Sequence, residues 1–196
     1  MSTTESIRTS RGEAIVDAAA LLFSTQGYAD TGIDEIGSAV GVTGPAVYRH
    51  FASKEDLLVA VLQRAVDHAA EIAPRARAEA TSPEDQLARL IEYSVSACIG
   101  DRVLTALYWQ HAPHLPGGPR QTIEVAQRRM IDEFAEVLRA VRPDLNPSEA
   151  RMAIYGVSSL MRSVAQRETT LDEARVHRLL ASMANAALLG ADPTSD

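Results

Sequence analysis

The stretch that decides the fold runs from residue 41 to residue 51 and reads Gly41-Val42-Thr43-Gly44-Pro45-Ala46-Val47-Tyr48-Arg49-His50-Phe51. Before it, the apolar residues Ile33, Ile36 and Val40 recur at helical spacing. After the turn, Val47 provides an apolar side chain against which this face can pack. A short glycine-containing turn between two short amphipathic helices is typical of a helix-turn-helix. We therefore expect this motif over about residues 32–51, with Gly41 in a backbone conformation that a side chain would penalise.

Outward from this stretch, apolar residues recur every three or four positions, which predicts an all-α protein of about nine helices. Helical segments are expected at about 11–26, 33–40, 44–51, 54–73, 83–100, 101–112, 119–141, 148–168 and 172–190. Residues 75–82 are expected to form a connector, and the proline- and glycine-rich residues 113–119 a loop. A natural boundary follows the first three predicted helices and divides the chain into residues 1–56 and 57–196.

Local sequence also predicts how the first helices begin and end. Gly27 would close the first helix, as a glycine after the last apolar residue commonly does. Thr31, with Asp34 three residues later, would cap the second helix. Ser53 and Asp56 resemble a capping box, which predicts the start of the long fourth helix.

The composition bounds the class of protein. The net charge is −7, and residues 1–56 hold four Arg and Lys residues against eight Asp and Glu residues. DNA binding would therefore depend on where the few cations lie. Cys98 is the single cysteine, and no apolar run approaches the ~20 residues of a membrane span. The N-terminal residues also lack the apolar stretch of a signal peptide, so we expect a cytoplasmic protein.

The outer face of the third predicted helix carries the residues expected to contact DNA. Small residues at its start would let the backbone approach the duplex, and Tyr48 and His50 could bond phosphates. Arg49 is the candidate for a bidentate contact to guanine. The predicted DNA-binding residues are Thr43, Gly44, Pro45, Ala46, Tyr48, Arg49, His50 and Lys54.

Residues 41–58, together with the order Phe23, Gly27, Tyr28 and Thr31 upstream, closely resemble the N-terminal domain of the TetR family of bacterial repressors. The resemblance covers about residues 11–60, and Gly37 departs from it because an alanine is usual there. It implies a symmetric dimer on a palindromic operator, with half-sites about 34–36 Å apart. It also implies a DNA-binding domain over residues 1–56 and a ligand-binding and dimerisation domain, the body, over residues 57–196. A small-molecule effector would bind the body and release the operator.

In the body, large and polar side chains gather in the predicted helix 101–112, and neighbouring helices carry further aromatic and sulfur-containing residues. Effector pockets are mostly apolar with a few placed polar groups, so these side chains are candidates to line one. An ordinary hydrophobic core is the competing interpretation. The candidate residues are Tyr93, Tyr108, Trp109, His111, Met130, Phe134 and Tyr155. The sequence does not identify the effector, which could be an acyl thioester, another amphipathic anion or a neutral hydrophobic molecule.

The two last helices have apolar stripes, which predict a homodimer through a four-helix bundle, with packing inside one chain as the alternative. No catalytic residue, metal or cofactor is expected. His111 and His114, with His68 or Cys98, could bind a metal, but their spacing does not require it. A transcriptional activator, or a ligand-binding protein whose head no longer binds DNA, remains an alternative to the repressor.

Overall fold

The computed structural model describes residues 3–165 and 169–190. Over these residues it contains no strand, so the predicted all-α fold is confirmed. The last three residues of the predicted helix 148–168 lie outside the description. The elements are α1 (Thr3–Gln26), α2 (Ile33–Ala39), α3 (Gly44–Val47), α4 (Lys54–Ala70), α5 (Ile72–Glu79), α6 (Pro83–Gly100), α7 (Arg102–His111), the 3₁₀ turn η1 (Ala112–His114), α8 (Gly117–Val141), α9 (Pro147–Ala165) and α10 (Glu173–Leu189).

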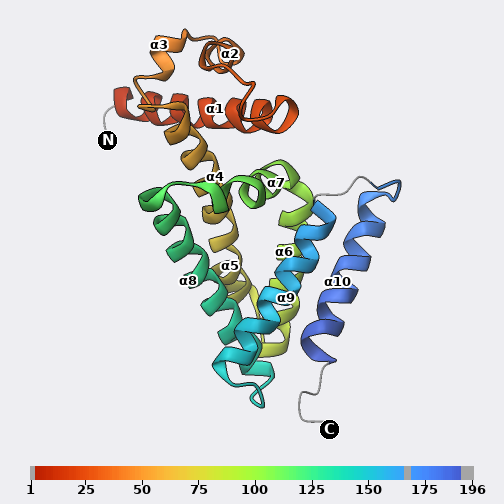
Figure 1. Ribbon diagram of the computed structural model, residues 1–196. Coiled ribbons are helices and arrows are strands. Elements are labelled where there is room, and N and C mark those ends of the chain that lie inside the picture. Colours follow the sequence, from red (N-terminus) through yellow and green to blue (C-terminus); the bar gives the residue numbers. More distant parts are fainter. Residues whose placement is uncertain (1–2, 166–168, 191–196) are drawn as a thin grey trace.

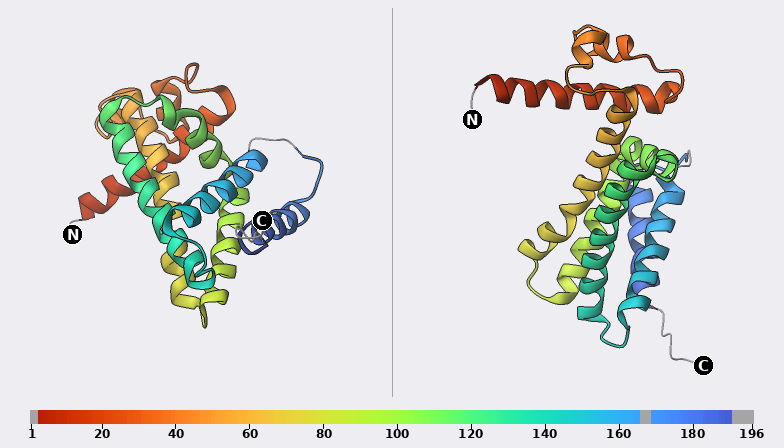
Figure 2. Two further views of the ribbon diagram at one scale, coloured as in Figure 1. Left: turned by 60° about the horizontal axis from the view of Figure 1, so that its bottom comes forward. Right: turned by 60° about the vertical axis from the view of Figure 1, so that its left-hand side comes forward.

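The helices form a small head at one end of a larger body (Figure 1). The head consists of α1, α2 and α3, and α4 runs from it down into the body. Helix α7 crosses the top of the body directly beneath the head, as the right-hand view of Figure 2 also shows. The remaining helices run along the body, with α9 and α10 on the side away from α4. Helix α7 therefore lies between the head and the rest of the body.

The described residues contain one α-helix more than the nine expected, because the predicted connector at 75–82 is largely helical. Helix α4 ends at Ala70, and α5 begins at Ile72 with Pro74 as its third residue. The first turn of a helix has no intrahelical partner for its N–H groups, so a proline there removes no hydrogen bond. The predicted helix 54–73 ended before Pro74, whereas Pro74 lies in the first turn of the next helix.

Two further local expectations were wrong for related reasons. Helix α8 begins at Gly117, inside the expected loop, and Pro119 again occupies a first turn, where its missing N–H is harmless. Thr31 does not cap α2, since the N-cap is Gly32 and has no side-chain hydrogen bond. The Thr31 hydroxyl instead donates to the carbonyl of Gly27 at 2.8 Å and is buried. Ser53 does cap α4, accepting from the backbone N–H of Asp56 at 3.0 Å.

Close packing between α2 and α3 fixes the angle of the helix-turn-helix. Ile36 and Val47 are buried in one cluster with Leu57 of α4. Gly41 has φ +71°, the left-handed conformation expected of it. Gly37, which the sequence analysis treated as a departure from a pattern, is buried, and a Cβ there would lie 2.9 Å from the carbonyl oxygen of Val42. The absence of a side chain at Gly37 lets the turn lie directly against α2.

The hydrophobic core of the head extends into the body. The buried cluster around Phe23 and Leu57 also includes Leu107 of α7 and Ile123 of α8, and Leu115 from the connection between them. A second cluster fills the body between α5, α6, α8, α9 and α10. The position of the head is therefore set by side chains of α7 and α8 as well as by α4.

The head core predicts a contrast between two identical substitutions. Leu57→Ala removes a fully buried side chain, and we expect it to lower the free energy of unfolding by about 2–5 kcal/mol. Leu21→Ala removes a side chain that is 58% exposed on α1, and we expect a change within about 0.5 kcal/mol. Urea denaturation followed by circular dichroism measures both. Equal losses in the two variants would contradict the assignment of Leu57 to the core.

Candidate DNA-binding surface and effector cavity

Helix α3 is shorter than the sequence predicted, because regular α-helix ends at Val47. The chain then tightens: Arg49 N–H donates to the carbonyl of Ala46 and His50 N–H to that of Val47, both three residues back. Such bonds are common in the last turn of a helix. The turn ends at Phe51, whose N–H donates to the Val47 carbonyl at 3.1 Å. Residues 44–51 therefore form one continuous hydrogen-bonded segment after the Gly41 turn.

The predicted DNA-binding residues divide into an exposed group and a packed group. Tyr48 is 53% exposed, and Thr43, Pro45 and Arg49 are exposed beside it. We call these four residues the α3 corner. Gly44 is buried instead of outward-facing, and a Cβ there would overlap the carboxylate of Asp34 on α2. Its predicted place on the outer face is therefore wrong, since its missing side chain serves the packing of α3 on α2.

The other predicted contacts lie at the edge of this surface. Ala46 and His50 are half-buried, and the His50 ring lies beside α1 near Gly12. Lys54 already has partners, because its Nζ donates to the carbonyl of Ala29 at 3.1 Å and lies 4.7 Å from the centre of the Tyr28 ring. In this structure Lys54 fastens the loop between α1 and α2 to the start of α4.

Two adjoining chambers lie in the body between α4, α6, α7, α8 and α9, with volumes of about 130 Å³ and 140 Å³. We call them the first and the second chamber. Both are lined by Ala65, Ala69, Thr105, Trp109, Met130 and Ser158. The first also reaches Tyr108, and the second reaches Phe134 and Arg162. Four of the seven predicted effector residues, namely Tyr108, Trp109, Met130 and Phe134, therefore line this space.

Burial keeps the Tyr108 hydroxyl neutral. Desolvation, followed by the nearby carboxylate of Glu124, raises the pKa of Tyr108 to about 12, so its hydroxyl stays protonated at physiological pH. The ring of Trp109 stacks edge-on against that of Tyr108, with centres 5.2 Å apart. On its other side the guanidinium Cζ of Arg162 lies 4.8 Å from the centre of the Trp109 ring.

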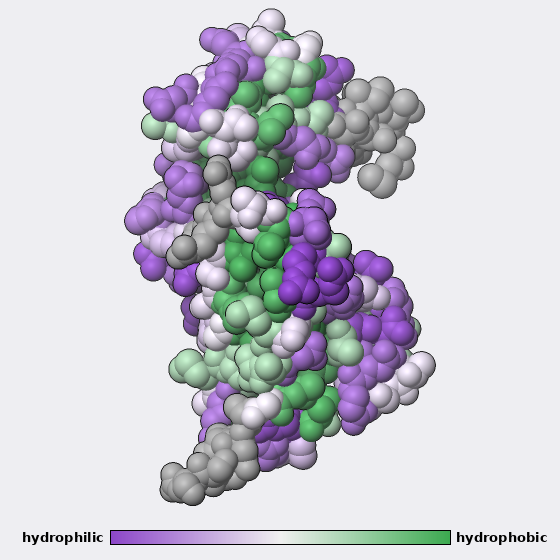
Figure 3. Space-filling model, turned by 90° about the vertical axis from the view of Figure 1, so that its right-hand side faces the viewer, coloured by the Kyte–Doolittle hydropathy of each residue, from purple (hydrophilic) through white to green (hydrophobic). Residues whose placement is uncertain are grey.

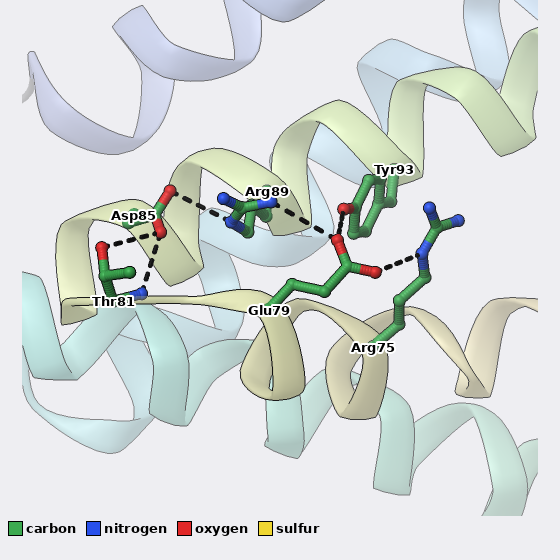
Figure 4. Close-up of polar contacts among 6 residues, drawn as sticks. All are labelled: Arg75, Glu79, Thr81, Asp85, Arg89 and Tyr93. Atoms are coloured by element: carbon green, nitrogen blue, oxygen red, sulfur yellow. Dashed lines mark hydrogen bonds and ion pairs between the residues drawn. The ribbon is translucent and has the colours of Figure 1, made fainter.

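Tyr93, also predicted to bind the effector, does not line either chamber. It belongs to a polar network that ties α5 to α6, drawn in Figure 4. The Tyr93 hydroxyl donates to Glu79, and Arg75 lies 4.0 Å from the centre of the Tyr93 ring. The bond from Tyr93, followed by that from Arg75, lowers the pKa of Glu79. With a guanidinium on one side and a carboxylate at its hydroxyl, Tyr93 has its partners outside the cavity.

Tyr155 and His111 also lie outside the chambers. Tyr155 is 41% exposed on α9, on a face that the structure leaves open. His111, at the end of α7, faces the head, and its ring centre lies 5.7 Å from that of Tyr28. Spacing along α7 could not separate Trp109 from His111, since only the packed structure shows which helix each one meets.

Sequence reasoning missed most of the remaining cavity wall. Ala65 and Ala69 lie four residues apart on α4, where larger side chains would fill the space. Two small residues on one apolar stripe were a usable signal for a cavity. Arg162 gave no such signal, because an arginine on an amphipathic helix is usually solvated.

Two of the residues considered for a metal, His68 and Cys98, have other partners. His68 Nδ1 lies 3.3 Å from Asp101 Oδ2, and the Asp101 side chain makes no capping hydrogen bond on α7. The Cys98 thiol donates to the carbonyl of Met161 at 3.3 Å, and burial raises its pKa. Over residues 3–165 and 169–190, no group of three or more His, Cys, Asp and Glu side chains could hold a metal ion.

Comparison with known proteins identifies the family of the chain. Residues 15–61 match the profile of the bacterial regulatory proteins of the tetR family. The chain belongs to the TetR family. It is 47% identical over 58 residues to the transcriptional activator FasR of Mycolicibacterium smegmatis, covering 30% of this chain and 26% of FasR. It is 28% identical over 144 residues to the repressor KstR2 of the same organism, covering 70% of each.

A third relative is matched over about half of its length. The match to the regulator HbdR of an Aromatoleum species covers 63% of this TetR-family chain and 55% of HbdR, at 29% identity. The chain therefore spans about a quarter of FasR and about half of HbdR.

Solved TetR-family structures share the whole fold. A regulator from Rhodococcus RHA1 superposes with a TM-score of 0.78 at 21% identity, over 93% of this chain and 98% of that one. AibR, solved with isovaleryl coenzyme A and operator DNA, superposes with a TM-score of 0.72 at 19% identity, over 88% and 97% of the two chains. Among the described helices of this TetR-family protein, none is long and apolar enough to cross a membrane.

His111 gives a pH-dependent prediction for this TetR-family protein. Burial, followed by the charge of His114, lowers the His111 pKa below its ordinary value of about 6.5. As the pH falls below about 6.5, the unfolded chain therefore binds the proton before the folded chain, and stability is lost. His111→Phe keeps a ring against Tyr28 and removes Nε2, which is buried and has no hydrogen-bond partner among the described residues.

We expect His111→Phe to be at least as stable as the unaltered protein at pH 7.5, and to lose less of its Tm between pH 7.5 and pH 5.5. Thermal unfolding followed by circular dichroism at both pH values measures this. Equal losses of Tm in the two proteins would show that His111 does not have a lowered pKa.

Proposed function

We propose that this protein is a transcriptional repressor that binds a palindromic operator as a homodimer and is released when a small molecule fills the two chambers. The observation that carries the proposal is the α3 corner, an exposed Tyr48 and Arg49 on a turn whose inner side is held by the buried Val47. A helix-turn-helix needs this arrangement, because the side chains that meet DNA must project from a rigid backbone.

In this proposal residues 1–56 bind DNA, and residues 57–196 bind the effector and dimerise. The acidic balance of the head is compatible with DNA binding, because each subunit needs only a few phosphate contacts and backbone N–H groups can supply some of them. Relatives support both directions of regulation, since KstR2 is named a repressor and FasR an activator. A regulator of chromosomal genes would act in the cytoplasm.

The dimer is supported by an exposed apolar strip on α9 and α10. Figure 3 shows hydrophobic surface running along this side of the molecule. The strip includes Met152 and Tyr155 of α9 and Leu179 and Met183 of α10. Contiguous apolar surface of this kind is unusual on a monomer and typical of an interface. A two-fold axis beside α9 and α10 would bury it in a four-helix bundle.

Effector release is supported by the place of α7. One end of α7 places Trp109 in the wall of both chambers, and its last residue, His111, packs on Tyr28 of the head. Leu107 of the same helix is buried in the head core. A ligand that shifts α7 would therefore move the head. AibR, whose fold is similar, was solved with both an acyl coenzyme A and operator DNA.

The DNA-binding proposal predicts a specific effect of Arg49→Ala. We expect it to weaken binding to the operator by about 5- to 150-fold, because a bidentate arginine–guanine contact contributes ~1–3 kcal/mol. A mobility-shift titration on the DNA upstream of the protein's own gene measures this. Arg129→Ala, which removes an 82% exposed arginine from α8, is the matched control and should leave binding unchanged.

The salt dependence of the same titration should be shallow, reflecting few phosphate contacts. The absence of a specific complex on the upstream DNA and on a pool of random duplexes would refute the repressor, and would favour a ligand-binding protein whose head no longer binds DNA. A reporter gene driven by the operator decides between repression and activation.

The dimer proposal predicts that Met183→Glu separates the subunits. Met183 is 52% exposed, and a carboxylate there would be buried without a partner in both copies of a symmetric interface. We expect the dimer dissociation constant to rise by about 100-fold or more, measured by sedimentation velocity. Val125→Glu changes an exposed side chain on α8 and should leave the dimer intact. A dimer that survives Met183→Glu would place the interface elsewhere.

A further inference from the structure

Arg162 sets the two chambers apart from an ordinary apolar cavity. Its guanidinium lies at the wall of the second chamber, over the ring of Trp109, which lines both chambers. Within the described part of the chain no carboxylate lies within 4 Å of its nitrogen atoms, whereas many other arginines of the body are ion-paired. A half-buried cation with only an aromatic face as partner is a ready site for an anion.

The other charged groups at this wall are already matched. Asp101 is the one carboxylate among the residues that line the two chambers, and it faces His68 at 3.3 Å. A cationic effector would therefore have to compete with His68 for Asp101, while an anionic one would meet the unpaired Arg162. The hydroxyl of Ser94, on the wall of the second chamber, is also buried without a hydrogen-bond partner in the described structure.

The apolar lining and the small volume of the chambers favour a hydrocarbon of limited size. The floor of the second chamber is formed by apolar side chains, among them Ile72, Leu104, Phe134 and Met161. Each chamber holds about 130–140 Å³. A cavity of about 150 Å³ accommodates a benzene ring, so two adjoining chambers suit a hydrocarbon of about six to ten carbons. A bulky polycyclic ligand would not fit without rearrangement.

We infer that the effector is an amphipathic carboxylate of about six to ten carbons, whose carboxylate binds Arg162 and whose hydrocarbon fills the two chambers. That this ligand regulates DNA binding rests on the proposed function, whereas the binding of the carboxylate to the cavity does not.

The test uses the full-length protein, with octanoate as the probe and octan-1-ol as its uncharged match. Trp109 is the single tryptophan of the chain and lies against Arg162, so its fluorescence reports directly on the site. We expect octanoate to change the fluorescence with saturation, and to bind about tenfold or more tightly than octan-1-ol.

Variants identify the anion contact. Arg162→Met keeps an apolar stem and removes the charge, and it should weaken octanoate by about tenfold or more while leaving octan-1-ol unchanged. Arg162→Lys should restore part of the octanoate affinity, and Arg129→Met, remote and 82% exposed, should change nothing. If Arg162→Met does not fold, the comparison of the two probes on the unaltered protein and on Arg162→Lys still decides.

Equal binding of octanoate and octan-1-ol would overturn the inference in favour of a neutral apolar effector, and no binding of either would overturn it as well. The outcome is separable from that of the proposed function. A protein that binds octanoate through Arg162 but no operator would refute the repressor and support the carboxylate site. A protein that binds its operator and ignores octanoate would do the reverse.

Discussion

The continuity of the hydrophobic core beneath the helix-turn-helix is the constraint on which the rest of the structure depends. Phe23, Ile36 and Leu57 of the head share one buried cluster with Leu107 of α7 and Ile123 of α8. Protein interiors are close-packed and transmit strain, because side chains have few alternative positions. We therefore expect any reorientation of the head on the body to involve α7.

Helix α4 adds a second connection of a different kind. Its N-terminus is capped by Ser53 within the head, and Leu57 and Val61 are buried in the head core. Two turns further on, Ala65 and Ala69 face the chambers with side chains too small to fill them. One rigid helix thus carries both a wall of the cavity and the base of the DNA-binding surface.

Prediction from sequence succeeded where a signal is local and failed where two elements meet. The turn at Gly41 and the cap at Ser53 were read correctly, because each depends on a few neighbouring residues. Pro74 was misread as a helix end, although a proline in a first turn breaks no hydrogen bond, and the helix predicted from Pro119 begins two residues earlier, at Gly117. Gly44 was placed on the outer face, because nothing in its own segment shows that Asp34 lies against it.

The sequence by itself determined the all-α fold, the helix-turn-helix and the family, because helical periodicity and turn chemistry are written in consecutive residues. Only the tertiary structure decided which large side chains line a cavity. Tyr108 and Trp109 face the chambers, while Tyr93 is held by Arg75 and Glu79 outside them. The pairing of Arg162 with Trp109 joins residues 53 positions apart on two helices, and no local pattern encodes how those helices cross.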